Sequence, residues 1–351
     1  MNVYQKIRQN TRYKNSGKWL SIKTIDMHTG GEPLRVIVEG FPELKGKSIL
    51  EYRNDVKQNY DHLRTTLMFE PRGHADMYGC LLTPPVSEEA DFGIIFMHNE
   101  GYSTMCGHAT IAIAKLAVEM GWVNVMEPLT IVKIDAPCGL LTTYIEVVDG
   151  KVKSVTFDNV PSYVDSLDNN LDVNEIGKIQ YDLAYGGAFY AFVNARKLGI
   201  DLIPDNYQKL ITTGMAIKHE VIATNKSIRH PYEEDLSFLY GTIFIGDPVS
   251  TPSDSRNVCV FADGEVDRSP TGSGVSARMA IHHKRNEIGL NEWMTIESIL
   301  GSSFKCCVKE VVTYGGFEAV IPSVQGTAYI TGQNEFLIDP QDPMKEGFIL
   351  R

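Results

Sequence analysis

Residues 105–118 read Met-Cys-Gly-His-Ala-Thr-Ile-Ala-Ile-Ala-Lys-Leu-Ala-Val. After the glycine, the run contains neither proline nor glycine and is almost entirely small or apolar, which predicts a buried helix. Cys106 would then lie at the N-terminus of that helix, beside free backbone N–H groups and the positive end of the helix dipole. Such a position lowers the pKa of a thiol and favours the thiolate, the form that acts as a base or nucleophile. A buried structural cysteine is the alternative interpretation at this point.

A second stretch repeats this design in the C-terminal part of the chain. Residues 267–280 read Asp-Arg-Ser-Pro-Thr-Gly-Ser-Gly-Val-Ser-Ala-Arg-Met-Ala, a polar glycine-rich turn followed by small residues that begin a helix. Thr271 precedes Gly272 as Cys106 precedes Gly107, and about one domain length separates the two pairs. Two such helix starts indicate a duplicated fold in which both helix N-termini face one cleft. Their backbone N–H groups would hold an anion there, most simply a carboxylate.

The bulk composition narrows the class of protein. The chain has 351 residues, of which 43% are hydrophobic and 22% charged, and this length predicts two domains. A net charge of −11 without a block of lysine and arginine argues against nucleic acid or an anionic membrane as partners. No stretch approaches the roughly 20 apolar residues of a membrane span, and the polar N-terminus does not resemble a signal peptide. We therefore expect a cytoplasmic enzyme.

Metal binding is not expected. The six cysteines form no CxxC pair and no spaced Cys/His quartet; they are Cys80, Cys106, Cys138, Cys259, Cys306 and Cys307. His74 and Asp76 could be two metal ligands, but their polar loop favours a hydrogen-bonded pair instead.

The order of predicted elements is strands, central helix and more strands, twice. Helical spacing is expected within 44–67 and over 207–225, and the glycines at 186 and 187 separate two strand-like pieces. We expect an N-terminal arm at 1–19, a first half at 20–175 and a second half at 176–335. Residues 336–351 are expected to form a C-terminal segment, with a return to the first half as one option. The polar stretch 159–177 marks the boundary region between the halves.

The two motifs resemble those of the proline racemase family, as do the Arg-Gly-His loop at 72–74 and the Thr-Gly-Gly-Glu-Pro turn at 29–33. The resemblance extends over nearly the whole chain from about residue 20. It implies an α+β fold of two similar halves, as in diaminopimelate epimerase. Each half would be a central helix wrapped by mostly antiparallel strands, with the active site in the cleft between them. It also implies that neither a cofactor nor a metal is used.

The resemblance assigns roles to particular residues. Cys106 matches the first of the family's two catalytic cysteines, whereas Thr271 occupies the position of the second and is a non-catalytic replacement. The branch of the family with threonine at that position eliminates water from trans-3-hydroxy-L-proline instead of inverting Cα. Asp267 would bind the ring ammonium of the substrate, although without the resemblance it would be a helix cap or turn residue. The backbone groups that would hold the carboxylate belong to Gly107, His108, Gly272 and Ser273.

The chemistry of these side chains fits an elimination. A threonine hydroxyl is too weakly acidic to deliver a proton as a thiol does, but a substrate with a β-hydroxyl needs only one base. In trans-3-hydroxy-L-proline the hydroxyl lies on the same ring face as Hα. Cys106 could therefore remove Hα and then protonate the leaving hydroxyl, with a water molecule or His108 as alternative acids. The enamine product would tautomerise to 1-pyrroline-2-carboxylate, so the expected activity is that of a hydro-lyase.

Two alternatives remain at this point. A racemase of proline or a 2-epimerase of 4-hydroxyproline would share the fold, but Thr271 argues against it. A non-catalytic amino-acid-binding protein would keep the cleft and have an unreactive Cys106. The expected partner is a small imino acid, and a homodimer is one option for the assembly.

Overall fold

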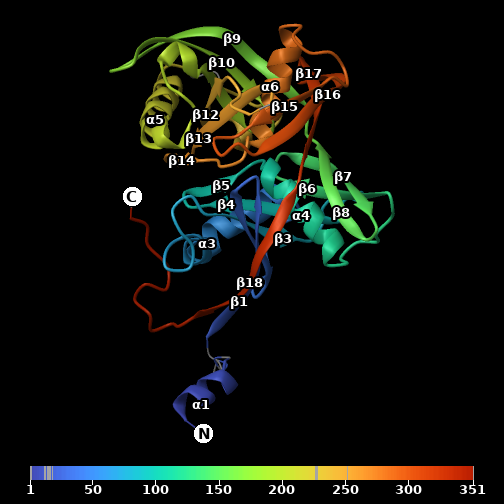
Figure 1. The fold of residues 1–351 in the computed structure, drawn as a ribbon, viewed down its shortest axis with the longest axis vertical. Helices are drawn as coiled ribbons and strands as arrows, with labels where there is room; N and C mark the ends of the chain where they lie inside the picture. Colours follow the sequence, from blue (N-terminus) through green and yellow to red (C-terminus); the bar gives the residue numbers. More distant parts are fainter. Residues whose placement is uncertain are drawn as a thin grey trace.

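Each half of the protein is built around one of the two predicted central helices. The structure is a computed structural model that describes residues 2–11, 13, 17, 19–225, 228–250 and 252–350. Helix α4 spans Gly107–Glu119 and helix α6 spans Gly272–Lys284. Every residue of α4 from Gly107 to Val118 is buried, as expected for a helix that is small and apolar on all sides. Figure 1 shows the two halves one above the other, with α6 in the upper and α4 in the lower half.

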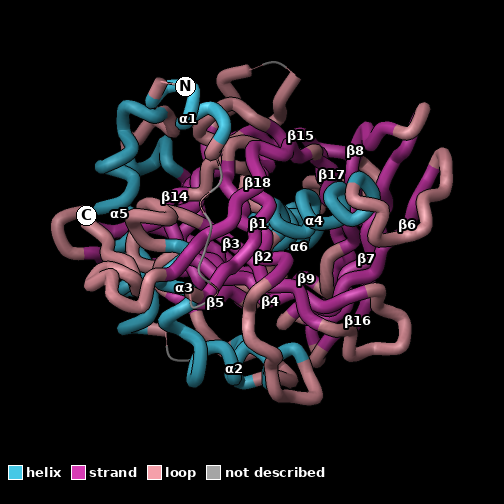
Figure 2. Tube along the Cα trace, turned by 90° about the horizontal axis from the view of Figure 1, so that it is seen from below, coloured by secondary structure: helices cyan, strands magenta, loops and turns pink. Residues whose placement is uncertain are grey.

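Strands enclose both helices. Helix α4 contacts strands from both ends of the chain, and α6 contacts strands of the second half (Figure 2). The strands before α4 are β1 (Leu20–Thr29), β2 (Glu32–Glu39), β3 (Tyr78–Thr83), β4 (Phe92–His98) and β5 (Gly101–Ser103). Those after α4 are β6 (Leu129–Ala136), β7 (Gly139–Val148) and β8 (Lys151–Asp158). The second half contains β9 (Ser162–Val173), β10 (Gly177–Tyr185), β11 (Phe189–Asn194), β12 (Leu239–Gly246), β13 (Ser255–Phe261), β14 (Glu265–Val266), β15 (Trp293–Glu297), β16 (Ser303–Tyr314) and β17 (Phe317–Gly326).

The strand pairings repeat from one half to the other. Strands β2 and β3 are parallel, as are their counterparts β11 and β12. Strand β4 pairs with β3 and β5 in antiparallel fashion and with β6 in parallel, and β13 pairs with β12, β14 and β15 in the same senses. The duplication inferred from two short motifs therefore extends through the whole pairing scheme. The protein has the α+β fold of two similar, mostly antiparallel halves.

The two halves are joined by strands that follow the β8 and β17 strands in the chain. Strand β9 follows β8 and pairs with β10 and β17, whereas β18 (Ala328–Ile338) follows β17 and returns to pair with β1. Strand β17 also pairs with β8, so hydrogen bonds join the halves directly. The polar stretch expected at the boundary contains the long strand β9 rather than a linker. The domain limits at 175 and 335 stay a prediction.

The remaining helices lie outside the strands (Figure 2). In the chain, helices α2 (Ile49–Asp55) and α3 (Asp61–Met68) come after β2 and before β3, and one π-helical turn joins them. Helix α5 (Tyr207–Thr224) comes after β11 and before β12. The arm at 1–19 is described only in part; it contains the short helix α1 (Val3–Gln9), none of whose residues is buried. In the described part of the chain, no helix is both long enough and apolar enough to cross a membrane.

Candidate active site

The N-termini of the two central helices meet at two glycines. Cys106 is the N-cap residue of α4 and Thr271 is the N-cap residue of α6. A Cβ atom built on Gly107 would lie only 2.5 Å from the Cα atom of Gly272, and the reverse contact is equally short. Only glycine allows two backbones to approach so closely. The unpaired N–H groups of both helices therefore point toward one place, which is an arrangement for binding an anion.

Thr271 has a backbone conformation that is rare for its residue type. Its φ angle is +68°, in the region that a β-branched side chain adopts only under constraint from its surroundings. Its hydroxyl oxygen is buried and has no hydrogen-bond partner among the described residues. Backbone strain and an unpaired hydroxyl are both typical of functional sites.

A small cavity between the halves brings together all the site residues expected from the sequence. Its lining includes the predicted residues Cys106, Gly107, His108, Asp267, Thr271, Gly272 and Ser273. It also includes Met105 and four aromatic residues that the sequence analysis did not identify, namely Tyr78, Tyr190, Tyr240 and Phe261. Met105 lay inside a quoted motif. The aromatic residues lie on or at the ends of ordinary strands, where nothing in the local pattern distinguishes them from core residues. The roles of the seven predicted residues stay a prediction.

The environment of Cys106 differs from the one expected of a helix N-terminus. Burial raises the pKa of its thiol well above the ordinary value, against the opposing effects of the Ala109 backbone N–H and the Tyr78 hydroxyl. Asp267 and Glu32 raise it further through their negative charge. The prediction of a lowered pKa is therefore wrong for this site, because the loss of hydration outweighs the helix N-terminus.

His108 is a neutral neighbour of the thiol. Its Nδ1 atom lies 3.1 Å from Sγ of Cys106, and burial lowers its pKa to about 3, although a hydrogen bond to the Pro33 backbone acts in the opposite direction. A neutral imidazole has one N–H donor and one acceptor nitrogen. With one nitrogen bonded to the Pro33 backbone, the other is available to accept a hydrogen bond from the Cys106 thiol.

Two buried carboxyl groups lie at the cavity: Asp267 lines it, and Glu32 acts on Asp267 from outside the lining. Asp267 accepts a hydrogen bond of 2.7 Å from the Ser269 backbone, and burial raises its pKa. Glu32 is completely buried and accepts a bond of 2.7 Å from the Arg268 backbone. The pKa of Glu32 is raised well above the ordinary value by burial and then by Asp267. Two adjacent acidic groups in a dry environment favour a bound cation.

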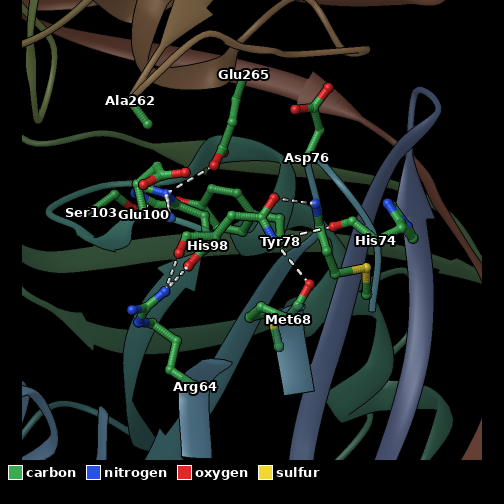
Figure 3. Close-up of polar contacts among 12 residues, drawn as sticks. Arg64, Met68, His74, Asp76, Tyr78, His98, Glu100, Ser103, Ala262 and Glu265 are labelled. Atoms are coloured by element: carbon green, nitrogen blue, oxygen red, sulfur yellow. Dashed lines mark hydrogen bonds and ion pairs between the residues drawn. The ribbon is translucent and has the colours of Figure 1, made fainter. Parts of the chain in front are cut away.

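The loop beside the cavity is fixed by polar contacts between the halves. Figure 3 shows Glu265 of the second half approaching His98 of the first, and their Oε1 and Nδ1 atoms are 3.5 Å apart. Arg64 reaches the backbone carbonyl of His98 at 2.9 Å. Asp76 accepts hydrogen bonds of 2.7 Å from the Tyr207 hydroxyl and 2.8 Å from the Arg268 side chain. These contacts hold the segment that carries Tyr78 against the second half.

His74 and Asp76 are both hydrogen-bonded, as expected, but to other groups and not as a pair. The Nδ1 atom of His74 lies 2.7 Å from the Ala75 carbonyl oxygen, while Asp76 bonds to the second half. No group of three or more His, Cys, Asp or Glu residues within the described ranges is arranged to hold a metal ion.

Comparison with known proteins gives consistent results over nearly the full chain. The sequence profile of the family described as proline racemase matches residues 24–349. A protein of Colwellia psychrerythraea named trans-3-hydroxy-L-proline dehydratase is 53% identical over 95% of this chain and 94% of its own. A human protein with the same name is 44% identical over 94% of this chain and 95% of its own.

Epimerases are also among the similar proteins. A 3-hydroxyproline 2-epimerase of Burkholderia multivorans is 43% identical over 94% of this chain and 98% of its own. Among solved structures, a hydroxyproline epimerase of Agrobacterium vitis with bound trans-4-hydroxy-L-proline has a TM-score of 0.88 and 31% identity. That match covers 94% of this chain and 96% of the other.

Proposed function

The chain belongs to the proline racemase family, and from that premise we propose that it is a trans-3-hydroxy-L-proline dehydratase, a hydro-lyase that forms 1-pyrroline-2-carboxylate. The observation that carries the proposal is the pair of helix N-termini that meet at Gly107 and Gly272, with Cys106 on one side and Thr271 on the other. This arrangement supports one acid–base group on one face of the substrate and none on the opposite face.

The backbone around the two glycines binds the substrate carboxylate. Removal of Hα creates negative charge that spreads into this carboxylate, so fixed N–H donors stabilise the transition state more than the ground state. The donors belong to Gly107, His108, Gly272 and Ser273. The Ser273 side chain is held by a 2.6 Å hydrogen bond to the Tyr190 hydroxyl, which helps to fix the start of α6.

Asp267 binds the ring ammonium and thereby prepares the base. The negative charge of Asp267 contributes to the raised pKa of Cys106, so a cation placed beside Asp267 offsets that contribution and favours the thiolate. The neutral imidazole of His108 is positioned to hold the thiol by a hydrogen bond, since Nδ1 lies 3.1 Å from Sγ, but with a pKa of about 3 it is too weak a base to keep the thiol proton. Substrate binding and activation of the base are therefore coupled through charge.

A single base completes the reaction. The Cys106 thiolate removes Hα, the C3–O bond breaks, and the thiol returns the proton to the departing hydroxyl on the same face. Because the pKa of His108 is about 3, its imidazole is a poor acid at neutral pH, which favours Cys106 or a water molecule as the acid. Thr271 supplies no proton to the opposite face. The enamine then tautomerises to 1-pyrroline-2-carboxylate.

The test is incubation of the protein with trans-3-hydroxy-L-proline, followed by mass spectrometry for the loss of one water. Cys106→Ala should abolish the product, whereas Cys306→Ala, which removes a buried thiol outside the cavity, should retain turnover. Full activity of a verified Cys106→Ala preparation would refute the mechanism. No turnover by the parent, together with an unreactive Cys106 on titration with an alkylating agent, would favour a non-catalytic binding protein.

An epimerase is the second candidate, because one relative at 43% identity carries that name. Inversion at Cα requires a proton donor on the face opposite Cys106, where this chain has Thr271. Chiral chromatography of 3-hydroxyproline, 4-hydroxyproline and proline after incubation in heavy water distinguishes the reactions. Inversion of any of them as fast as dehydration of trans-3-hydroxy-L-proline would replace the dehydratase assignment by this one.

A further inference from the structure

The proposed substrate has three polar groups, and the site assigned above accounts for only two of them. This inference rests on the proposed function and concerns the third group. The carboxylate meets the helix N-termini at Gly107 and Gly272, and the ring ammonium meets Asp267. The 3-hydroxyl, which distinguishes the substrate from proline, meets the Cys106 thiol only after Hα has been removed and has no partner in the bound substrate before that step. A buried hydroxyl without a partner would weaken binding, so the cavity must offer it a hydrogen-bonding group.

Two side chains that line the cavity have unpaired hydroxyls. Among the described residues, the buried hydroxyls of Tyr240 and Thr271 make no well-formed hydrogen bond, although the Tyr78 side chain lies beside Tyr240 and the Asp267 carboxyl lies beside Thr271. Such groups are rare enough in folded proteins to need an explanation, and a ligand is one. The hydroxyls of Tyr163 and Tyr185 are also unpaired, but neither residue lines this cavity.

The stereochemistry of the substrate selects between the two hydroxyls. In the trans isomer, the 3-hydroxyl lies on the ring face of Hα and therefore points toward Cys106 and away from Thr271. Ring contacts connect Tyr240 to the Cys106 side of the cavity: Tyr240 meets His98 at 6.0 Å, and His98 stacks on Tyr78 at 5.7 Å. The ring of Tyr78 in turn meets that of His108, beside Cys106, at 4.8 Å. Burial raises the pKa of Tyr240, so Tyr240 keeps its proton and acts as a donor.

The ring of Tyr240 is held firmly by other aromatic residues. It stacks on Phe261 with centroids 5.3 Å apart and meets the edge of Tyr190 at 5.8 Å. The ring of Tyr240 also meets the ring of His98 edge to face, with centroids 6.0 Å apart. The hydroxyl is therefore fixed in place before the substrate arrives, which favours selective binding.

We propose that the Tyr240 hydroxyl donates a hydrogen bond to the 3-hydroxyl oxygen of the substrate and thereby selects a trans-3-hydroxylated imino acid over proline. Proline leaves the Tyr240 hydroxyl buried and unpaired, as a site built to bond a hydroxyl does with an analogue that lacks it. The same bond supports the oxygen as the C3–O bond breaks. The cis isomer directs its hydroxyl toward Thr271 instead.

The experiment compares affinities rather than rates. Binding of trans-3-hydroxy-L-proline, cis-3-hydroxy-L-proline and L-proline is measured by calorimetry in a Cys106→Ala background, where turnover does not interfere. Adding Tyr240→Phe should weaken binding of the trans isomer by about 3- to 15-fold, the effect of one lost hydrogen bond. The affinities for L-proline and the cis isomer should not fall, which also shows that the variant is folded.

Two tyrosine variants serve as matched controls. Tyr190→Phe removes a hydroxyl from the same cavity that is already bonded to Ser273, and Tyr185→Phe removes an unpaired hydroxyl from outside the cavity. Neither should change the ratio of the affinities for trans-3-hydroxy-L-proline and L-proline. If Tyr240→Phe left the ratio of the affinities for trans-3-hydroxy-L-proline and L-proline unchanged, including by weakening both equally, the proposal would be overturned. Failure of the unmodified protein to dehydrate trans-3-hydroxy-L-proline would instead refute the proposed function, whatever the ratio.

Discussion

Gly107→Ala tests the contact on which the whole site depends. The added Cβ would lie 2.5 Å from the Cα of Gly272, 3.0 Å from its carbonyl carbon and 3.1 Å from Cζ of Phe157. Ordinary contacts between carbon atoms are about 3.5–4.0 Å, so the two helix N-termini must separate by roughly 1 Å. Neither partner at Gly272 can rotate away, because both atoms are backbone. The variant therefore moves the carboxylate donors without removing any functional side chain.

The expected costs fall on both stability and activity. Overpacking in a closed interior costs about 1–3 kcal/mol of unfolding free energy, measurable by urea denaturation. A misplacement of about 1 Å in a catalytic site lowers kcat/KM by roughly 100-fold, measurable from the formation of 1-pyrroline-2-carboxylate. Gly272→Ala should act in the same way. The double variant should cost less than the sum of the two, because the first substitution already separates the helices.

Gly332→Ala is the matched control. It adds the same methyl group on strand β18, where the nearest atom, Nδ2 of Asn334, would be 4.0 Å away. Its unfolding free energy should stay within about 0.5 kcal/mol of the parent. Parental stability and kcat/KM in Gly107→Ala would show that the helix N-termini do not meet as the structure has them. Strict additivity of Gly107→Ala and Gly272→Ala would refute the shared contact.

Three further predictions concern charge and proton transfer. Asp267→Asn keeps the acceptor for the Ser269 backbone but loses the charge that meets the ring ammonium, so kcat/KM should fall about 10- to 150-fold; an unchanged kcat/KM would make Asp267 purely structural. Thr271→Cys should gain proline or 4-hydroxyproline epimerisation, seen as deuterium at Cα with inversion in heavy water, and inversion by the parent at a similar rate would contradict this role of Thr271. Because the folded-state pKa of Glu32 is raised, the stability it contributes is present below the unfolded-state pKa near ~4.3 and is lost as the pH rises toward the folded-state pKa. Glu32→Gln should therefore gain thermal stability relative to the parent as the pH rises from about 4 to 8; equal pH profiles for the parent and Glu32→Gln would contradict this.

The raised pKa of Cys106 shows where local sequence reasoning reached its limit. A cysteine before a buried helix correctly predicted the position of Cys106 as N-cap of α4. The local sequence does not contain the neighbours that determine its ionisation, because Asp267 and Glu32 come from distant parts of the chain. The sign of a pKa shift depends on the balance of burial, hydrogen bonds and charges. At Cys106 the burial and the nearby charges arise from residues that only the tertiary structure brings together.

The sequence by itself determined the two helix starts and the duplication, because these depend on short-range patterns of glycine, small residues and apolar periodicity. It also placed Cys106 and Thr271 at matching positions. The fold class and the contrast between one and two acid–base groups followed from the resemblance of these motifs to those of the proline racemase family. Only the tertiary structure decided that Gly107 touches Gly272, that Tyr78, Tyr190, Tyr240 and Phe261 enclose the site, and that β18 returns to pair with β1 of the first half. Those features join residues far apart in the chain, and the periodicity of one strand or helix carries no information about which distant element will cover it.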